Sequence, residues 1–384
     1  MVSSRARWLF LGAIALVVAL AAACGDGAAE PPLTPTAEQP PSVLVFLRGD
    51  DLWVATLDGS SLPRAITSGS VAAQYAGFVR TASGEIELYY TEQLREVSDD
   101  AEPNAEAALY RVGLESGIRD ELFHFKSRQL SPYHTSAAVS PNGRYVLLSD
   151  FEGITLLDLS SGATRSLLAN SPPCEGPMSC FGYGSPRWSP TGQRALITKT
   201  FWEGGSDIVI DPFEEPVEEE DTPGGASLRA GWSADGERIC VSEFTYSSAG
   251  AVLVYDLSTG DTVDSTLGLP LPMPSEPGRL RIDAQGCAWA ADGRLAFGYV
   301  VPDNLGNARE GRIAVVDASF AVLAESAPVA NLSTVVAWLR DGSGVLFNRW
   351  QPQEGRPRPP GIFDLERGLI ELPFEADAVL AVIP

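Results

Sequence analysis

Acidic side chains in one segment are the residues of this chain best suited to catalysis. Asp99 and Asp100 lie in the stretch 91–106, with Glu102 beside them. Two carboxyl groups at the right separation can cleave a glycosidic bond by acid–base chemistry, so a carboxylate-dependent polysaccharide lyase or glycosidase is one hypothesis. A charged connecting loop explains the same residues more simply. The pattern Gly-x-Ser-x-Gly is absent, and His124 and His134 are the only histidines. We therefore expect a protein that is not an enzyme.

The cysteines suggest cross-links rather than metal ligands. Cys174 and Cys180 bracket five residues of a loop, which suits a small disulfide in an oxidising compartment. Cys240 and Cys287 lie on strands of successive repeat units, so adjacent units could bring them together, with buried free thiols as the alternative. No Cys-x-x-Cys pair occurs, and the acidic run 214–221 lacks the spacing of a calcium loop. We expect no metal and no cofactor.

Aromatic side chains recur near the ends of one kind of predicted strand. Counted from the turn glycine that precedes each strand, they fall at even offsets, so alternation places them on one side. A ring of aromatics could stack on sugars or hold a peptide, but packing between repeat units is the preferred interpretation. These residues are Tyr90, Phe151, Trp202, Tyr246, Tyr299 and Trp350.

A repeated turn positions all of these residues. The stretch 139–143, Val-Ser-Pro-Asn-Gly, returns as Trp-Ser-Pro-Thr-Gly and Trp-Ser-Ala-Asp-Gly, and its glycine stands at 84, 143, 192, 236, 293 and 342. Each copy precedes an apolar run that favours a strand, and a second strand and turn follow within the period. Four strands in a period of 44 (192 to 236) to 59 (84 to 143) residues indicate an all-β propeller.

The strand count predicts seven four-stranded blades, with six as the alternative. The first unit lacks its own first strand, and the C-terminal run 378–383 supplies a spare one. Pairing of this run with the first unit would close the ring and remove an open sheet edge.

Surplus length concentrates in two of the four connections of each unit. The turns between strands one and two, and between strands three and four, are short, whereas the other connections are long. In a propeller the two sets lie on opposite faces, so we expect one elaborated face that binds a ligand. Neutral drift in loop length is the alternative. The long segments are 91–106, 170–186, 212–228, 268–285, 302–311 and 351–360.

The turn motifs, together with Val-Tyr-Asp-Leu-Ser-Thr-Gly at 254–260, resemble the TolB-like propeller repeats, which are related to WD repeats. The resemblance extends from residue 43 to residue 384 and implies the fold. It implies no particular partner, because the α/β domain that precedes the TolB propeller has no counterpart in this sequence.

Residues 1–23 have the pattern of a signal peptide, with Arg5 and Arg7 before an apolar run of twelve residues. The sequence Leu-Ala-Ala-Ala-Cys at 20–24 resembles the lipobox of bacterial lipoproteins. The resemblance implies a diacylglycerol and fatty acyl (palmitate-type) anchor on Cys24, with ordinary secretion as the alternative. Residues 24–42 are rich in proline and would form a tether. The expected location is the extracytoplasmic side of a bacterial membrane.

Charge narrows the choice of partner. Fifty acidic against 27 basic residues give a formal net charge of −23, which would repel nucleic acid phosphates. We therefore expect a monomeric, lipid-anchored propeller that serves as a binding platform for an envelope protein, peptide or glycan.

Overall fold

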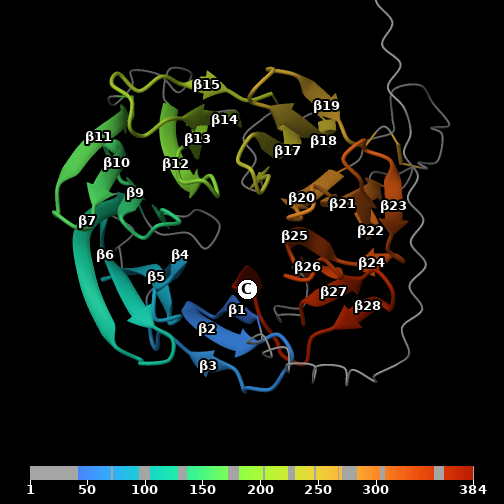
Figure 1. Cartoon of the computed structure of the whole chain (residues 1–384), viewed down its shortest axis with the longest axis horizontal. Coiled ribbons are helices and arrows are strands. Elements are labelled where there is room, and N and C mark those ends of the chain that lie inside the picture. Colours follow the sequence, from blue (N-terminus) through green and yellow to red (C-terminus); the bar gives the residue numbers. More distant parts are fainter. Residues whose placement is uncertain are drawn as a thin grey trace, which may run out of the picture. The chain divides into compact units, whose positions relative to one another are not determined.

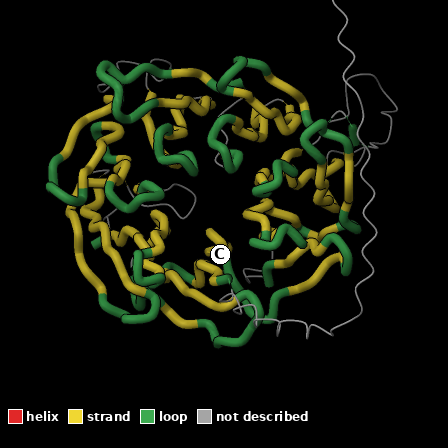
Figure 2. Tube along the Cα trace, in the orientation of Figure 1, coloured by secondary structure: helices red, strands yellow, loops and turns green. Residues whose placement is uncertain are grey.

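The computed structural model describes residues 42–70, 72–94, 104–128, 136–171, 181–201, 204–223, 230–245, 248–266, 268–269, 283–302, 308–349 and 359–383. These residues belong to one compact unit, Pro41–Pro384, and the remaining unit is Met1–Pro40. In the described part every regular element is a strand (Figure 2). A search of the same residues finds no helix with the length and apolar character that crossing a membrane requires.

The strands form seven antiparallel sheets arranged in a ring, which we number as blades in chain order (Figure 1). The expectation of seven blades is confirmed. Blade 1 contains β29 (Ala378–Ile383), β1 (Val43–Arg48), β2 (Asp51–Thr56) and β3 (Arg64–Ala65); blade 2 contains β4 (Ala73–Arg80), β5 (Ile86–Gln93), β6 (Asn104–Gly113) and β7 (Arg119–Arg128); blade 3 contains β8 (Ala137–Val139), β9 (Tyr145–Ser149), β10 (Gly153–Asp158) and β11 (Thr164–Ala169); blade 4 contains β12 (Phe181–Trp188), β13 (Ala195–Phe201), β14 (Gly204–Ile210) and β15 (Glu220–Asp221).

The remaining three blades follow the same order. Blade 5 contains β16 (Gly231–Trp232), β17 (Arg238–Thr245), β18 (Ser248–Asp256) and β19 (Thr262–Asp264); blade 6 contains β20 (Asp283–Trp289), β21 (Leu295–Pro302), β22 (Ala308–Val316) and β23 (Val322–Glu325), with β24 (Val329–Ala330) as an extra strand on β22; blade 7 contains β25 (Leu332–Trp338), β26 (Gly344–Arg349), β27 (Gly361–Asp364) and β28 (Gly368–Glu371).

The C-terminal strand closes the ring, as the spare strand of the sequence predicts. β29 pairs antiparallel with β1, from Val43 opposite Ile383 to Leu47 opposite Ala378. The buried side-chain amide of Asn348 on β26 adds a clasp: it accepts a hydrogen bond from Val379 N at 2.8 Å and donates one to Val379 O at 2.9 Å. Blade 7 therefore holds the closing strand through side-chain bonds as well as packing.

Apolar side chains on both faces of the blades form cores shared by neighbours. In one cluster Ala296 and Val315 of blade 6 pack with Val345 and Phe347 of blade 7, and all four are fully buried. Such double burial explains why the strands are apolar at consecutive positions, since each sheet faces a neighbour on both sides.

The repeated turn also links blades. The indole Nε1 of Trp338 donates to Ala288 O at 2.9 Å, and Trp188 Nε1 makes the equivalent bond to Ala138 O, also at 2.9 Å. Each acceptor lies on the first strand of the preceding blade. The tryptophan that begins the turn therefore satisfies a buried carbonyl of its neighbour.

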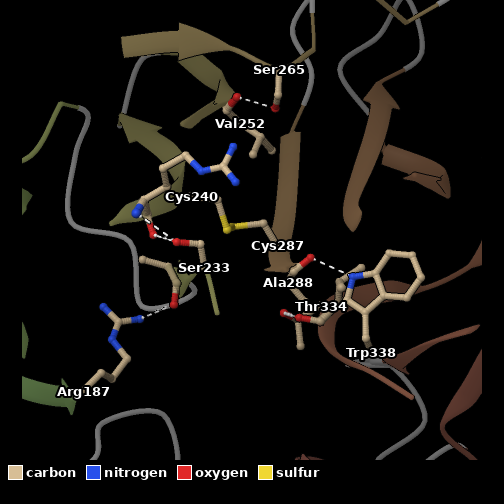
Figure 3. The surroundings of a disulfide bond; sticks show 12 residues. Arg187, Ser233, Cys240, Val252, Ser265, Cys287, Ala288, Thr334 and Trp338 are labelled. Atoms are coloured by element: carbon tan, nitrogen blue, oxygen red, sulfur yellow. Dashed lines mark hydrogen bonds between the residues drawn. A yellow bond between two sulfur atoms is a disulfide. The ribbon is translucent and has the colours of Figure 1, made fainter. Parts of the chain in front are cut away.

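A disulfide joins blades 5 and 6 (Figure 3). Cys240 on β17 and Cys287 on β20 are bonded, and both are buried. Of the two possibilities that the sequence left open for these cysteines, a disulfide or free thiols, the structure has the disulfide. Gly231 lies against this bond: a Cβ built on it would come 2.9 Å from Cys287 O and 3.2 Å from Cys240 Sγ. The close packing of the two blades here requires the absence of a side chain.

One predicted connection is divided between the two faces. The segment 212–228 was expected on the elaborated face, but β14 ends at Ile210 and β15 begins at Glu220. Residues 211–219 therefore connect strands three and four, which places them on the face with short turns. Arg165 on blade 3 holds this segment by donating to the carbonyls of Pro212 and Glu214.

Candidate functional site

Two of the predicted aromatic site residues serve packing. Tyr90 on β5 and Tyr299 on β21 are almost completely buried, in the clusters between blades 1 and 2 and between blades 5 and 6. Burial raises the pKa of both phenols. Neither ring is exposed at the surface, and both pack between blades, in keeping with the interpretation preferred from the sequence. The reason is position: both lie in the middle of their strands, away from the rim.

Charged groups support these buried tyrosines. Tyr299 OH donates to Glu325 Oε1 at 2.9 Å, and Arg312 donates to the same oxygen at 2.7 Å. In blade 2 the guanidinium of Arg119 lies 3.9 Å from the ring centroid of Tyr110, which stacks on Tyr90. These contacts stabilise the blades.

The exposed apolar side chains at the elaborated face lie elsewhere. Leu94 follows β5, Phe151 follows β9, and Phe201 ends β13; they are 36%, 42% and 46% exposed. Each stands where the second strand of its blade ends, and blades 2, 3 and 4 are consecutive in the ring (Figure 1). Single exposed apolar residues are ordinary, but three at equivalent places form a surface feature.

Blade 4 directs two phenylalanines toward blade 3. Phe181 on β12 pairs across the ladder with Phe201, and Tyr183 pairs with Lys199. These four side chains share one face of the sheet, since cross-strand partners and residues two apart do so. Tyr183 packs in a cluster with Ile154 of blade 3. The shared face is therefore the one turned to blade 3, where Phe151 lies.

Polar side chains fix this junction. Asn170 Nδ2 donates to Phe151 O at 2.8 Å, and Asn170 Oδ1 accepts from Tyr183 N at 2.7 Å. Ser171 Oγ donates to Phe181 O at 3.0 Å and accepts from Phe181 N at 2.9 Å. Two consecutive residues after β11 thus hold the backbones that carry Phe151 and Phe181. We call Phe151, Phe181 and Phe201 the aromatic patch.

A cation lies beside the patch. Lys199 Nζ lies 4.9 Å from the ring centroid of Phe181 and 5.4 Å from that of Tyr183. It also donates to Glu219 Oε2 at 2.7 Å, while Tyr183 OH donates to Glu219 Oε1 at 2.5 Å. Burial is the largest single influence on Lys199 and opposes its charge, but the interactions with Glu219 and Tyr183 together outweigh burial, and the pKa of the ammonium is raised. Lys199 is therefore charged near neutral pH.

Carboxylates border the patch on the blade 3 side. Asp150 accepts bonds from the backbone of Glu152 and Gly153 at 2.8 and 2.9 Å, and burial raises the pKa of its carboxyl in spite of them. Glu152 is exposed, directly after Phe151, and its carboxylate has no ion pair with any residue that the structure describes. An incoming group at the patch would meet aromatic rings and an available negative charge.

The other predicted site residues lie outside the described residues. They are Cys24, Asp99, Asp100, Cys174, Cys180, Trp202, Tyr246 and Trp350. Within the described ranges, no group of three or more His, Cys, Asp or Glu side chains is placed to hold a metal ion. Phe181, Lys199 and Phe201 were not predicted as site residues.

Comparisons with known proteins identify the fold. No protein-family model matches the chain, and no curated protein matches it. Among solved structures, a periplasmic gluconolactonase from Pseudomonas aeruginosa matches with a TM-score of 0.54 and 15% identity, over 89% of this chain and 96% of that chain. A putative 6-phosphogluconolactonase from Bacteroides fragilis matches with a TM-score of 0.51 and 12% identity, over 91% and 99%.

TolB from Acinetobacter baumannii also matches, with a TM-score of 0.45 and 17% identity, over 73% of this chain and 62% of TolB. Identities of this size show the fold alone, which proteins of many activities share. With the seven sheets closed into a ring, the fold of this chain is that of a seven-bladed β-propeller.

Proposed function

We propose that this protein is an extracytoplasmic β-propeller, anchored to a bacterial membrane through a lipid on Cys24, that serves as a binding platform for a protein, peptide or glycan of the envelope. Residues 1–23, which have the pattern of a signal peptide, support export across the membrane. The disulfide between Cys240 and Cys287 supports an oxidising compartment. One solved propeller of this fold, the gluconolactonase from Pseudomonas aeruginosa, is named as periplasmic.

The observation that carries the binding role is the aromatic patch. Phe151 and Phe201 are exposed where they would bury apolar area only against another molecule. Their backbones are held by Asn170 and by the β12–β13 ladder, so the surface is positioned before binding. Preorganisation of this kind lowers the entropic cost of association.

An enzyme that uses carboxylates is the alternative function. Of the carboxylates beside the patch, Asp150 is engaged by its own turn and Glu219 by Lys199 and Tyr183, so Glu152 has no second available carboxylate to act with. Bonds of this kind suit a structural role better than proton transfer to a substrate. Asp99 and Asp100 therefore carry the enzyme hypothesis, and their substitution separates it from the platform.

Photo-crosslinking in cells tests the binding role. A photoreactive amino acid at position 201 should give a discrete, stoichiometric adduct, and Phe151→Ser should weaken that adduct. The same amino acid at position 323, an exposed leucine on an outer strand, is the control. Equal adducts at both positions, or turnover of a polysaccharide by the purified protein that Asp99→Asn or Asp100→Asn abolishes, would overturn the platform.

A Cys24→Ala variant tests the anchor. It should move the protein from the membrane fraction to the soluble fraction and abolish incorporation of a labelled fatty acid. Retention of the label by this variant would contradict lipidation at Cys24.

A further inference from the structure

The binding role proposed above can be narrowed to one class of ligand by the chemistry of the patch. We propose that the aromatic patch binds a basic, apolar segment of a partner protein, that is, an extended stretch with arginine or lysine beside aliphatic or aromatic side chains. The inference rests on the proposed binding function and adds the chemical nature of the partner.

The protein's own lysine shows the recognition chemistry. The ammonium of Lys199 lies within 5.4 Å of the centroids of two aromatic rings and 2.7 Å from a carboxylate. A cation held between a ring face and an acid gains from both the ring quadrupole and the opposite charge. Since Lys199 is already neutralised by Glu219, it does not repel a second cation as a free ammonium would.

The exposed part of the patch also combines aromatic rings with a nearby carboxylate, but there no lysine or arginine among the described residues lies between them. Phe151 and Phe201 are exposed to solvent, and the next residue after Phe151 is the exposed Glu152. The half-buried Phe181 packs against the cluster between blades 3 and 4 and pairs across the ladder with Phe201. An arginine or lysine of a partner would find the combination that Lys199 uses, and its apolar neighbours would cover the rings.

Long-range charge favours the same partner. The chain carries a formal net charge of −23, so a basic segment is attracted and an acidic one is repelled before contact. Neutral glycans gain nothing from this field. Leu94 is exposed at the equivalent position on blade 2, the neighbour of blade 3 in the ring, so a segment longer than one residue has a further apolar side chain within the same face.

Fluorescence anisotropy of a short peptide tests the proposal directly. The full-length chain, purified in a neutral detergent, is titrated into rhodamine-labelled Arg-Leu-Leu-Arg-Leu-Leu amide, with Glu-Leu-Leu-Glu-Leu-Leu amide as the charge-reversed probe. Detergent alone supplies the blank. The basic peptide should bind and the acidic one should not, and raising the salt from about 0.05 M to about 0.5 M should weaken binding, because screening shortens the reach of the charges.

Substitutions locate the binding. Phe151→Ser and Phe201→Ser should each weaken binding of the basic peptide by about tenfold, as expected for removal of a central aromatic contact. Glu152→Gln should weaken it roughly two- to fivefold, at low salt only. Leu323→Ser removes a side chain that is 54% exposed on the outer strand β23 and should change nothing. Unchanged thermal unfolding of each variant shows that the fold is intact.

Several results would overturn the proposal. Equal binding of the acidic and basic peptides, or binding that survives both phenylalanine substitutions, contradicts it. Binding of a neutral oligosaccharide such as maltohexaose, lost on Phe201→Ser, in place of the basic peptide would also overturn it, while leaving the platform function in place. Absence of peptide binding together with absence of a crosslink at position 201 would contradict both the proposed ligand class and the proposed platform function.

Discussion

Loss of the disulfide between blades 5 and 6 should lower the stability of the propeller by a predictable amount. Cys240 and Cys287 are 47 residues apart, so the bond closes a loop of about that length in the unfolded chain. The chain-entropy model gives about 4 kcal/mol for such a loop at 25 °C. The folded ring holds the two blades together with or without the bond, because β29 pairs with β1. The effect should therefore appear mainly through the unfolded state.

Reduction isolates the cross-link without removing packing atoms. The experiment uses the full chain with Cys174→Ser and Cys180→Ser, so that only the described disulfide responds to the reductant. Guanidinium unfolding is followed with and without dithiothreitol. With a slope of about 4–6 kcal/mol/M, a loss of about 4 kcal/mol moves the midpoint down by roughly 0.7–1 M.

An unchanged unfolding midpoint after reduction would contradict this prediction. If thiol titration shows that Cys240 and Cys287 have been reduced and the midpoint stays within about 0.2 M, the entropic argument is wrong for this chain. Cys240→Ala with Cys287→Ala provides the control. This variant should be less stable than the oxidised protein and insensitive to dithiothreitol, whereas continued sensitivity would mean that another bond is responsible.

Three further changes should have measurable effects on stability. Trp338→Phe should cost about 1–2 kcal/mol more than Trp289→Phe in chemical denaturation. The indole N–H of Trp338 has a hydrogen-bond acceptor, whereas that of Trp289 has none among the described residues, and both rings lie under an arginine. Equal costs would contradict this reasoning. Asn348→Leu should cost roughly 2–5 kcal/mol, because two buried backbone groups of the closing strand lose their partner, and Asn348→Gln should restore little of it; a neutral effect would mean that the clasp is dispensable. The Arg367 guanidinium and backbone N–H groups hold the pKa of Asp364 at about 2, below its unfolded value of about 3.9. The contribution of Asp364 to the free energy of unfolding is therefore complete above about pH 4 and is lost as the pH falls toward about 2. Proton uptake on unfolding in that window should decrease in Asp364→Asn, and an unchanged uptake would refute the assignment.

The ring was predictable because its determinants are local. Pro-Asn-Gly and Ala-Asp-Gly turns require particular backbone angles, and Gly143 indeed has a φ of 70°. A spare apolar run at the C-terminus could only pair with the first unit. The segment 211–219 was misplaced because the strand that ends it, β15, is only the two acidic residues Glu220 and Asp221 and has no apolar pattern, although Asp211 begins a local turn by accepting from Phe213 N. Its position depends on Arg165, which reaches from another blade to hold its carbonyls.

The site was harder to predict because parity along a strand depends on the length of the preceding turn. In blade 6 the ladder resumes with Trp289 opposite Leu295, six residues on, whereas in blade 4 Trp188 is opposite Ala195, seven residues on. One additional residue moves every following side chain to the other face. Counting even offsets from the glycine therefore passed over Phe201, which is nine residues after Gly192.

Depth along the strand decides between core and surface once the face is known. Tyr299 stands six residues after its glycine and is buried by the neighbouring blade, whereas Phe151 stands eight residues after its own and has left the sheet. A side chain on the face of a blade that is turned to its neighbour can contact a ligand only where the neighbouring blade no longer covers it. In this propeller that condition is met at the rim between blades 3 and 4, where Asn170 fixes the chain and Phe151 and Phe201 reach solvent. The proposed binding surface therefore lies where the blades stop covering one another, which a sequence shows only after turn lengths and registers are known.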